Sequence, residues 1–173
     1  MINVIVACDR EGGIGKNHGI PWPPIKEDMK WFRESTMGHV VVMGSSTWNS
    51  FGMKKPLPGR KNVVFTSKPE SCPGADIYLN GNVEDELKKL EKEFPGLIIW
   101  VIGGSKIINQ CQNIINRWFI TKIDDVYNCD TFIPRIWDNE SYHCVHEQIN
   151  YTVIVSIVPR MYHDLTFEIW ELK

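Results

Sequence analysis

The stretch LIIWVIGGSKII, residues 97–108, joins an apolar run to a helical pattern across two glycines. Residues 97–102 are apolar at both alternating positions, as expected for a strand buried on both faces of a sheet. Ile107, Ile108 and Cys111 then recur at helical spacing after Gly103-Gly104. A buried strand that leads directly into a helix is typical of a parallel sheet covered by helices.

The same alternation extends along the chain. Runs rich in Val and Ile predict strands at 3–8, 39–43, 61–67, 75–79, 97–102 and 118–123. Helices are predicted at 25–35, 46–51, 83–94 and after Gly103-Gly104, with Asn82 as the N-cap of the third. The last third predicts antiparallel strands at 142–149, 152–158 and 162–172, with a turn at Pro159-Arg160.

These elements predict one α/β domain over residues 1–173. Its central sheet has about eight strands and is mostly parallel, with an antiparallel C-terminal edge and about four flanking helices. A hydrophobic fraction of 43% and a charged fraction of 23% are those of an ordinary globular protein.

Charge and cysteine content exclude several classes of function. The net charge is −2 and no basic cluster exceeds two residues, which argues against a nucleic-acid partner. The five cysteines are odd in number and irregularly spaced, which argues against a disulfide framework and against a metal site. No leader pattern and no apolar run of about twenty residues is found, so we expect a cytoplasmic protein without a membrane partner. No association surface is obvious in the sequence, so we expect a monomer.

Asp28 is the first candidate for chemistry. On the predicted helix, Ile25, Met29 and Phe32 form the expected inward face, and Asp28 adjoins it. The expected solvated side carries Lys26, Glu27, Lys30, Arg33 and Glu34. Asp28 is either a boundary acid favoured by the helix dipole or a buried carboxylate that needs a partner, which a ligand could supply.

Two turns resemble each other at the ends of predicted parallel strands. Residues 42–47, VMGSST, and residues 101–106, VIGGSK, both place glycine and hydroxyl groups where a strand meets a helix. Free backbone N–H groups at such turns attract phosphate, and two such sites would suit a dinucleotide. Glycines also end strands for steric reasons alone, so each turn by itself is a weak signal.

Three further segments have both a functional and a structural interpretation. The glycine-rich loop 12–22 ends in Trp22 and is either a lid that excludes water or a surface connection. The turn 56–61 presents Arg60, which is either a ligand-binding cation or a solvated one. Thr121 lies in an apolar strand, and its buried hydroxyl needs a partner in a site or in the backbone.

In order and spacing, these segments resemble the dihydrofolate reductase family over essentially the whole chain. The motifs that carry the resemblance are Ile14-Gly15, Ile20-Pro21-Trp22, Asp28 with Trp31-Phe32, Val42-Met43-Gly44 with Thr47-Trp48, residues 56–62, residues 101–105, and Thr121-Lys122-Ile123 with Asp130-Thr131-Phe132. The family resemblance implies reduction of 7,8-dihydrofolate to 5,6,7,8-tetrahydrofolate by NADPH, in support of one-carbon and thymidylate metabolism. Antifolate inhibitors are further ligands that it implies.

The resemblance also implies the site residues. Asp28 would hydrogen-bond the pterin, Thr121 would support Asp28, and Trp22 would hold a water beside the pterin. The implied substrate site consists of Ile5, Ala7, Asp28, Phe32, Phe51, Leu57, Arg60, Ile102 and Thr121, with Arg60 on the glutamate carboxylate. The implied cofactor site consists of Ala7, Ile14, Gly15, Gly19, Ile20, Gly44, Ser45, Ser46, Thr47, Thr66, Ser67, Lys68, Ile102, Gly103, Gly104, Ser105, Lys106, Ile107 and Ile108. A cis peptide bond between Gly103 and Gly104 is implied as well.

Two positions depart from the family pattern. Ser45-Ser46 stands where a basic residue is frequent, so selection of NADPH would rest on Lys68 and Lys106. Ile108 stands where a tyrosine is usual, which removes a hydroxyl. Two alternatives are a pyrimidine reductase of riboflavin synthesis, which leaves Arg60 and Trp22 unexplained, and a non-catalytic folate- or nucleotide-binding protein.

Overall fold

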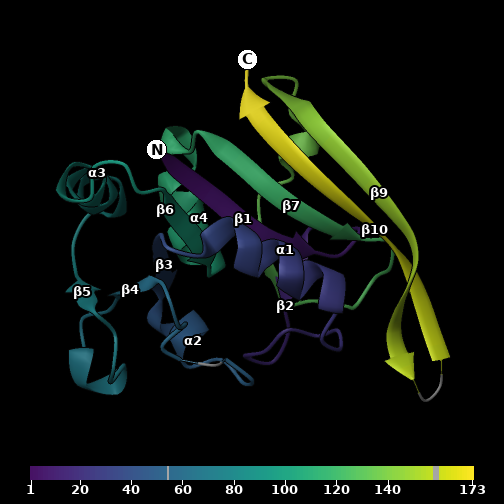
Figure 1. Ribbon diagram of the computed structural model, residues 1–173, viewed down its shortest axis with the longest axis horizontal. Helices are drawn as coiled ribbons and strands as arrows, with labels where there is room; N and C mark the ends of the chain where they lie inside the picture. Colours follow the sequence, from purple (N-terminus) through teal and green to yellow (C-terminus); the bar gives the residue numbers. More distant parts are fainter. Residues whose placement is uncertain (54, 158–159) are drawn as a thin grey trace.

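Six parallel strands and a long antiparallel hairpin form the central sheet. The computed structural model describes residues 1–53, 55–157 and 160–173, with side chains described for 1–53, 55–148 and 164–173. Within these residues the sheet has eight strands in the order β5-β4-β3-β6-β1-β7-β10-β9 (Figure 1). Their bounds are β1 Ile2–Cys8, β3 Val40–Gly44, β4 Lys61–Phe65, β5 Ile77–Leu79, β6 Ile99–Gly103, β7 Arg117–Ile123, β9 Tyr142–Ile157 and β10 Arg160–Leu172.

The strand directions confirm the predicted fold class. The strands β5, β4, β3, β6, β1 and β7 are parallel to their neighbours. In contrast, β10 is antiparallel to both β7 and β9. The six parallel strands therefore end at the same edge of the sheet, where the loops that follow them gather.

Four helices cover the two faces of the sheet. They are α1 Lys26–Thr36 and α2 Ser45–Trp48 on one face, and α3 Val83–Glu93 and α4 Ser105–Cys111 on the other. Asn82 caps α3 by accepting a hydrogen bond from the Asp85 N–H at 3.1 Å, as predicted. None of the helices in the described residues is long and apolar enough to span a membrane.

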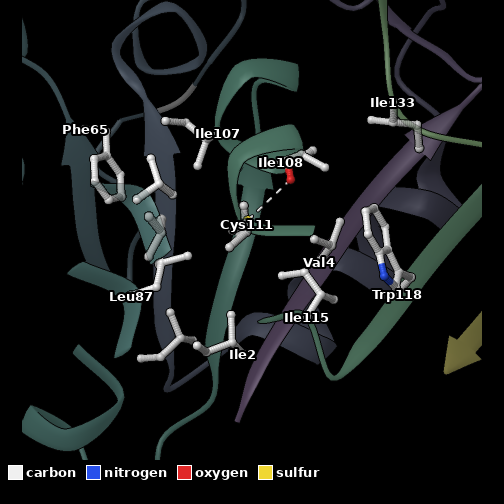
Figure 2. Close-up of a cluster of buried hydrophobic side chains, with 14 of the residues drawn as sticks. Ile2, Val4, Phe65, Leu87, Ile107, Ile108, Cys111, Ile115, Trp118 and Ile133 are labelled. Carbon is white, nitrogen blue, oxygen red and sulfur yellow. Dashed lines mark hydrogen bonds between the residues drawn. The ribbon is translucent and has the colours of Figure 1, made fainter. Parts of the chain in front are cut away.

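The larger core lies beneath α3 and α4. Figure 2 shows side chains from both helices pointing toward the strands, with Leu87, Ile108 and Cys111 facing Val4 and Ile2. The Cys111 thiol donates to the carbonyl of Ile108 at 3.5 Å. The other face packs β-strand residues such as Ile5 and Met43 against Trp48 of α2 and Phe32 of α1.

Two local predictions were wrong. The segments 142–149 and 152–158 are not separate strands, because β9 runs without a break from Tyr142 to Ile157. β9 pairs with β10 on both sides of the predicted break, and the register shifts there, between His163 and Leu165 of β10. A second sheet of β2 Gly13–Gly15 and β8 Thr131–Phe132 was missed, since such short strands have no hydrophobic period. The predicted turn at Pro159-Arg160 lies partly outside the described residues.

A partly buried ion pair joins β7 to β10. The Lys122 Nζ lies 2.9 Å from Glu168 Oε2, with 26% and 8% of the side chains exposed. The ammonium also lies 4.4 Å from the Trp137 ring, and the Trp170 N–H donates to the same Glu168 oxygen at 2.5 Å. A carboxylate so far removed from water depends on these partners.

We expect Lys122→Met to lower the free energy of unfolding by about 2 kcal/mol, because it leaves a buried carboxylate without its cation. Adding Glu168→Gln should recover most of that loss, since the pair is then replaced by neutral groups. Urea denaturation measures both effects. Lys30→Met is the matched control, because the Lys30–Glu34 pair is solvent-exposed on α1. An equal loss in Lys122→Met and Lys30→Met would contradict the assignment.

Candidate active site

The candidate site lies where the parallel strands end. Cys8, Gly44, Gly103 and Ile123 close β1, β3, β6 and β7 at one edge, and α1 packs on the sheet beside them. This arrangement brings Thr121 of β7 next to Asp28 of α1. It also brings together the glycine turns after β3 and β6, which are neighbouring strands.

Asp28 is on the inward face of α1 instead of beside it. Trp31 and Phe32 pack into the core beneath α1, and Thr36 is buried. They follow Asp28 by three, four and eight residues, which places all four on one face. Met29 was predicted to face inward, but it is 54% exposed. The bulky rings and Thr36 set the rotation of the helix, and this turns Met29 toward solvent.

The environment of Asp28 favours its neutral form. Burial raises the pKa of the Asp28 carboxyl above its usual value, and a hydrogen bond from the Thr121 hydroxyl acts in the opposite direction. Thr121 is itself buried and pairs with Ala7 of β1 in the sheet. A first-turn acid held only by the helix dipole would not show this burial. The second interpretation of the sequence, a buried carboxylate with a partner, is the one that the structure supports.

Trp22 closes the end of the site next to α1. Its ring is buried in a cluster with Ile25, Ile123 and Phe167. The Tyr127 ring meets it edge-on, with centroids 5.4 Å apart. Trp22 is therefore fixed between the start of α1 and the loop that follows β7.

Apolar side chains form the wall on the other side of Asp28. Ile5, Phe32, Leu57 and Ile102 belong to one cluster that includes Trp48, and Ala7 belongs to the neighbouring cluster around Trp22. Phe51 is different, because its side chain is 93% exposed. The structure thus brings together the predicted apolar residues except Phe51, which lies at the outside.

Arg60 is held at the far end of this wall. Its Nη1 donates to the Thr36 hydroxyl at 3.1 Å, and the guanidinium carbon lies 5.7 Å from the Phe32 ring centroid. Partial burial lowers the pKa of Arg60, and the nearby Arg33 cation lowers it further. Asn62 braces the turn by donating to the carbonyls of Leu57 and Arg60 at 3.0 Å. Arg60 on this braced turn, with the Arg33 cation of α1 nearby, suits a carboxylate ligand.

The two glycine turns meet in a narrow space. A Cβ added to Gly103 or Gly104 would lie 3.3 or 3.2 Å from Thr47 Oγ1, and one added to Gly44 would lie 3.3 Å from Ile107 Cγ1. The turns therefore present backbone in place of side chains. The Gly103-Gly104 peptide bond is cis, which confirms that prediction.

The remaining predicted cofactor residues surround these turns unevenly. Ser45 and Ser105 are half-buried beside the glycines, while Ser46, Ser67, Lys68 and Lys106 are exposed. Thr66 is half-buried and accepts a hydrogen bond from the Lys68 N–H at 3.0 Å. Ile108 has no exposed surface and faces the core (Figure 2). Its burial does not support the predicted contact with a cofactor.

The glycine-rich loop lies between β1 and α1 and is held by contacts with two other segments. Its half-buried residues Ile14 and Gly15 begin it, and Ile20 is largely exposed. The N–H of Asn17 donates to Asp130 Oδ2 at 2.8 Å, and the N–H of Phe51 donates to the carbonyl of His18 at 3.1 Å. The loop, with Gly19 near Phe51, is thus joined both to the segment before β8 and to the segment after α2.

Two carboxylates of this region were not predicted as site residues. The hydrogen bond from the Asn17 N–H lowers the pKa of Asp130, and a second hydrogen bond from the Thr131 hydroxyl adds to this effect. Asp9 is fully buried at the start of the loop. An acid directly after an apolar strand was the available signal for Asp9, and the Asp130-Thr131-Phe132 motif was the signal for Asp130.

Comparisons with known proteins agree on one family. The model of the family described as dihydrofolate reductase matches residues 1–153. Dihydrofolate reductase of Sus scrofa is 34% identical over 161 residues, covering 84% of this chain and 85% of the relative. That of Rattus norvegicus is 32% identical over 187 residues, covering 99% of this chain and 97% of the relative. A solved structure of the Enterococcus faecalis enzyme, complexed with NADP(H) and RAB-propyl, has a TM-score of 0.84 at 25% identity and covers 100% of this chain and 96% of its own.

We expect Asp28→Asn to stabilise the ligand-free protein at neutral pH. Because the pKa of Asp28 is raised on folding, its contribution to stability is fully present below the unfolded value near 3.8 and is lost as pH rises through the folded value. The asparagine avoids that loss. Unfolding in urea at several values between about pH 4 and about pH 8 should show the advantage of the variant growing with pH. A difference that is independent of pH would contradict this assignment.

Proposed function

The chain belongs to the dihydrofolate reductase family, and from this membership we propose the roles of its individual residues in the reaction. The protein catalyses NADPH-dependent reduction of 7,8-dihydrofolate to 5,6,7,8-tetrahydrofolate. The observation that carries the residue assignment is the Asp28–Thr121 pair, a half-buried carboxylate beside two glycine turns. The other residues of the site take their roles from their positions relative to that pair.

Asp28 anchors the pterin ring of dihydrofolate. A carboxylate can accept two parallel hydrogen bonds, here from a ring N–H and the adjacent amino group. The Thr121 hydroxyl occupies one of the roughly four acceptor positions of the carboxylate and leaves the others for substrate. Trp22, fixed against Tyr127, would hold a water beside the ring and so a proton path to the ring nitrogen that is protonated.

The rest of the substrate follows the apolar wall. Ile5, Ala7 and Ile102 would contact the pterin, and Phe32 and Leu57 the aminobenzoyl group. Arg60 would bind the α-carboxylate of the glutamate tail, because its guanidinium is already oriented by Thr36 and Phe32. Phe51 could contact this group only if it turned inward from its exposed position.

The glycine turns fit a dinucleotide. Glycine at 44, 103 and 104 lets the two turns approach each other closely, with Thr47 and Ser105 beside them. The backbone N–H groups that begin α2 and α4 would then bind phosphate together. NADPH supplies the hydride when it is bound. Lys68 and Lys106 are exposed cations for the 2′-phosphate, and Ser45, Ser46, Thr66 and Ser67 add hydroxyl groups. Residues 14–20 would then cover the nicotinamide and exclude water.

The alternatives explain less of this geometry. A pyrimidine substrate without a glutamate tail gives no role to the braced turn that carries Arg60. A non-catalytic binding protein gives no role to a carboxylate whose pKa is raised by burial.

All five cysteines are free thiols, which supports a reducing compartment such as the cytoplasm. The cytoplasmic location and the monomeric state stay predictions.

We expect the purified protein to consume NADPH only when dihydrofolate is present, and tetrahydrofolate to accumulate in equal amount. Asp28→Asn should lower kcat/KM at least about 100-fold, because the anchor for the pterin and its proton equilibrium are both lost. Asp138→Asn, on the surface beside Arg135, is the matched control and should keep full activity. Full activity of Asp28→Asn at neutral pH would overturn the role of Asp28.

We expect Thr121→Val to shift the pH profile of kcat/KM. Because the Thr121 hydroxyl stabilises the ionised form of Asp28, its removal raises the pKa of Asp28, and the inflection moves to higher pH. At neutral pH the loss should be about tenfold. Thr121→Ser keeps the hydroxyl and should keep the profile of the natural protein. A profile that does not move in Thr121→Val would show that the hydroxyl does not act on Asp28.

A further inference from the structure

Asp9 is a fully buried carboxylate to which the reaction assigns no role. It directly follows Cys8, the last residue of β1, and none of its surface is exposed. Burying a charge in this way is costly unless hydrogen bonds replace the lost water. Asp9 receives four such bonds, and their origin shows what the residue holds together.

The two oxygens of Asp9 bind two different segments. Oδ1 accepts from the N–H groups of Glu11 and Gly13 at 3.0 and 2.8 Å, at the base of the glycine-rich loop. Oδ2 accepts from the N–H of Tyr127 at 3.1 Å and from the thiol of Cys129 at 3.4 Å. The carboxylate therefore joins the start of the loop to the segment 124–130 that leads from β7 to β8.

The contact between these segments leaves no spare room. A Cβ added to Gly13 would lie 2.5 Å from both Cβ and Sγ of Cys129 and 3.0 Å from Asp9 Oδ1. The close approach of Gly13 allows its N–H to reach the carboxylate. Burial is the main reason that the pKa of the Cys129 thiol is raised to about 11, and the negative charge of Asp9 and the hydrogen bond to Asp9 act in the same direction. The thiol therefore stays protonated and donates.

The same segment also holds the far end of the loop. Asp130 follows Cys129 directly, and it accepts the N–H of Asn17 at 2.8 Å. The Lys16 ammonium donates to the carbonyl of Tyr127 at 3.3 Å. The base and the tip of the loop are thus bound to a single stretch of chain. Asp9 joins this stretch to the end of β1, beside the Arg10–Asp124 ion pair.

We propose that Asp9 is a positioning residue that fixes the loop 12–20 against the segment 124–130, on the cofactor side of the site. This inference rests on the proposed function in one respect, namely that the loop covers bound NADPH. Asp9 acts through Gly13, Tyr127 and Cys129 and does not touch substrate. Its two acceptor oxygens are both required, since an asparagine offers one acceptor and one donor and must lose one of the two segments.

The test compares Asp9→Asn with Leu87→Ala, which destabilises the distant helix α3 without contacting the loop. Hydrogen exchange of the ligand-free proteins should show faster exchange at amides 12–19 in Asp9→Asn only. The Kd for NADPH, measured by tryptophan fluorescence, should rise about tenfold in Asp9→Asn. The Kd for dihydrofolate should change less, because Asp28 and Arg60 are untouched. Equal exchange at residues 12–19 in both variants, or an unchanged Kd for NADPH, would overturn the proposal.

A second pair of variants keeps the proposal testable if Asp9→Asn does not fold. Cys129→Ser retains a donor to Asp9, whereas Cys129→Ala removes it. We expect faster exchange at residues 12–19 in the alanine variant and natural exchange in the serine variant. Identical loop exchange in the two variants would count against the proposal. Because exchange needs neither ligand, this outcome is independent of whether the natural protein reduces dihydrofolate.

Discussion

A carboxylate that the fold withdraws from water needs hydrogen-bond donors, and the number of donors supplied distinguishes the roles of three acids in this protein. Asp9 receives four donors and is satisfied within the protein. Glu168 receives the Lys122 ammonium and the Trp170 N–H. Asp28 receives the Thr121 hydroxyl and sits in an environment that raises its pKa. Of these three acids, Asp28 has the fewest donors, and a substrate can supply the missing ones.

The parallel sheet makes this arrangement possible with few residues. Because β1, β3, β6 and β7 all end at one edge, the loop after β1 and the glycine turns after β3 and β6 reach a common space beside Asp28 and Thr121. The antiparallel hairpin of β9 and β10 completes the sheet at the opposite side from β5. Helices cover both faces of the sheet, while the site residues lie at the edge where the strands end. Few positions must therefore serve both core packing and ligand binding.

The sequence predicted those features that depend on local pattern. Strand positions, the Asn82 cap and the meeting of Asp28 with Thr121 follow from periodicity, turn chemistry and family resemblance, and the structure agrees with them. Met29 was misplaced because the exact rotation of a helix depends on which side chains the sheet accepts. Asp9 was missed because two of its four donors, Tyr127 and Cys129, lie more than a hundred residues away along the chain. The residues next to Asp9 show only that an acid follows an apolar strand, and they do not show which distant segment it binds.

Ile108 shows how packing constrains the remaining departure from the family pattern. Its side chain is fully buried among apolar residues, including Val4 and Trp118, so a hydroxyl at this depth would need a partner or an opening to the cleft. The isoleucine meets neither need and instead fills the core beneath α4 (Figure 2). The side chain of Ile108 therefore contributes packing, while the glycines before α4 bring backbone close to Thr47. The polar side chains of the site then lie on the opposite side, at Asp28, Thr121 and Trp22. There, burial and hydrogen bonding together determine the protonation of the Asp28 carboxyl.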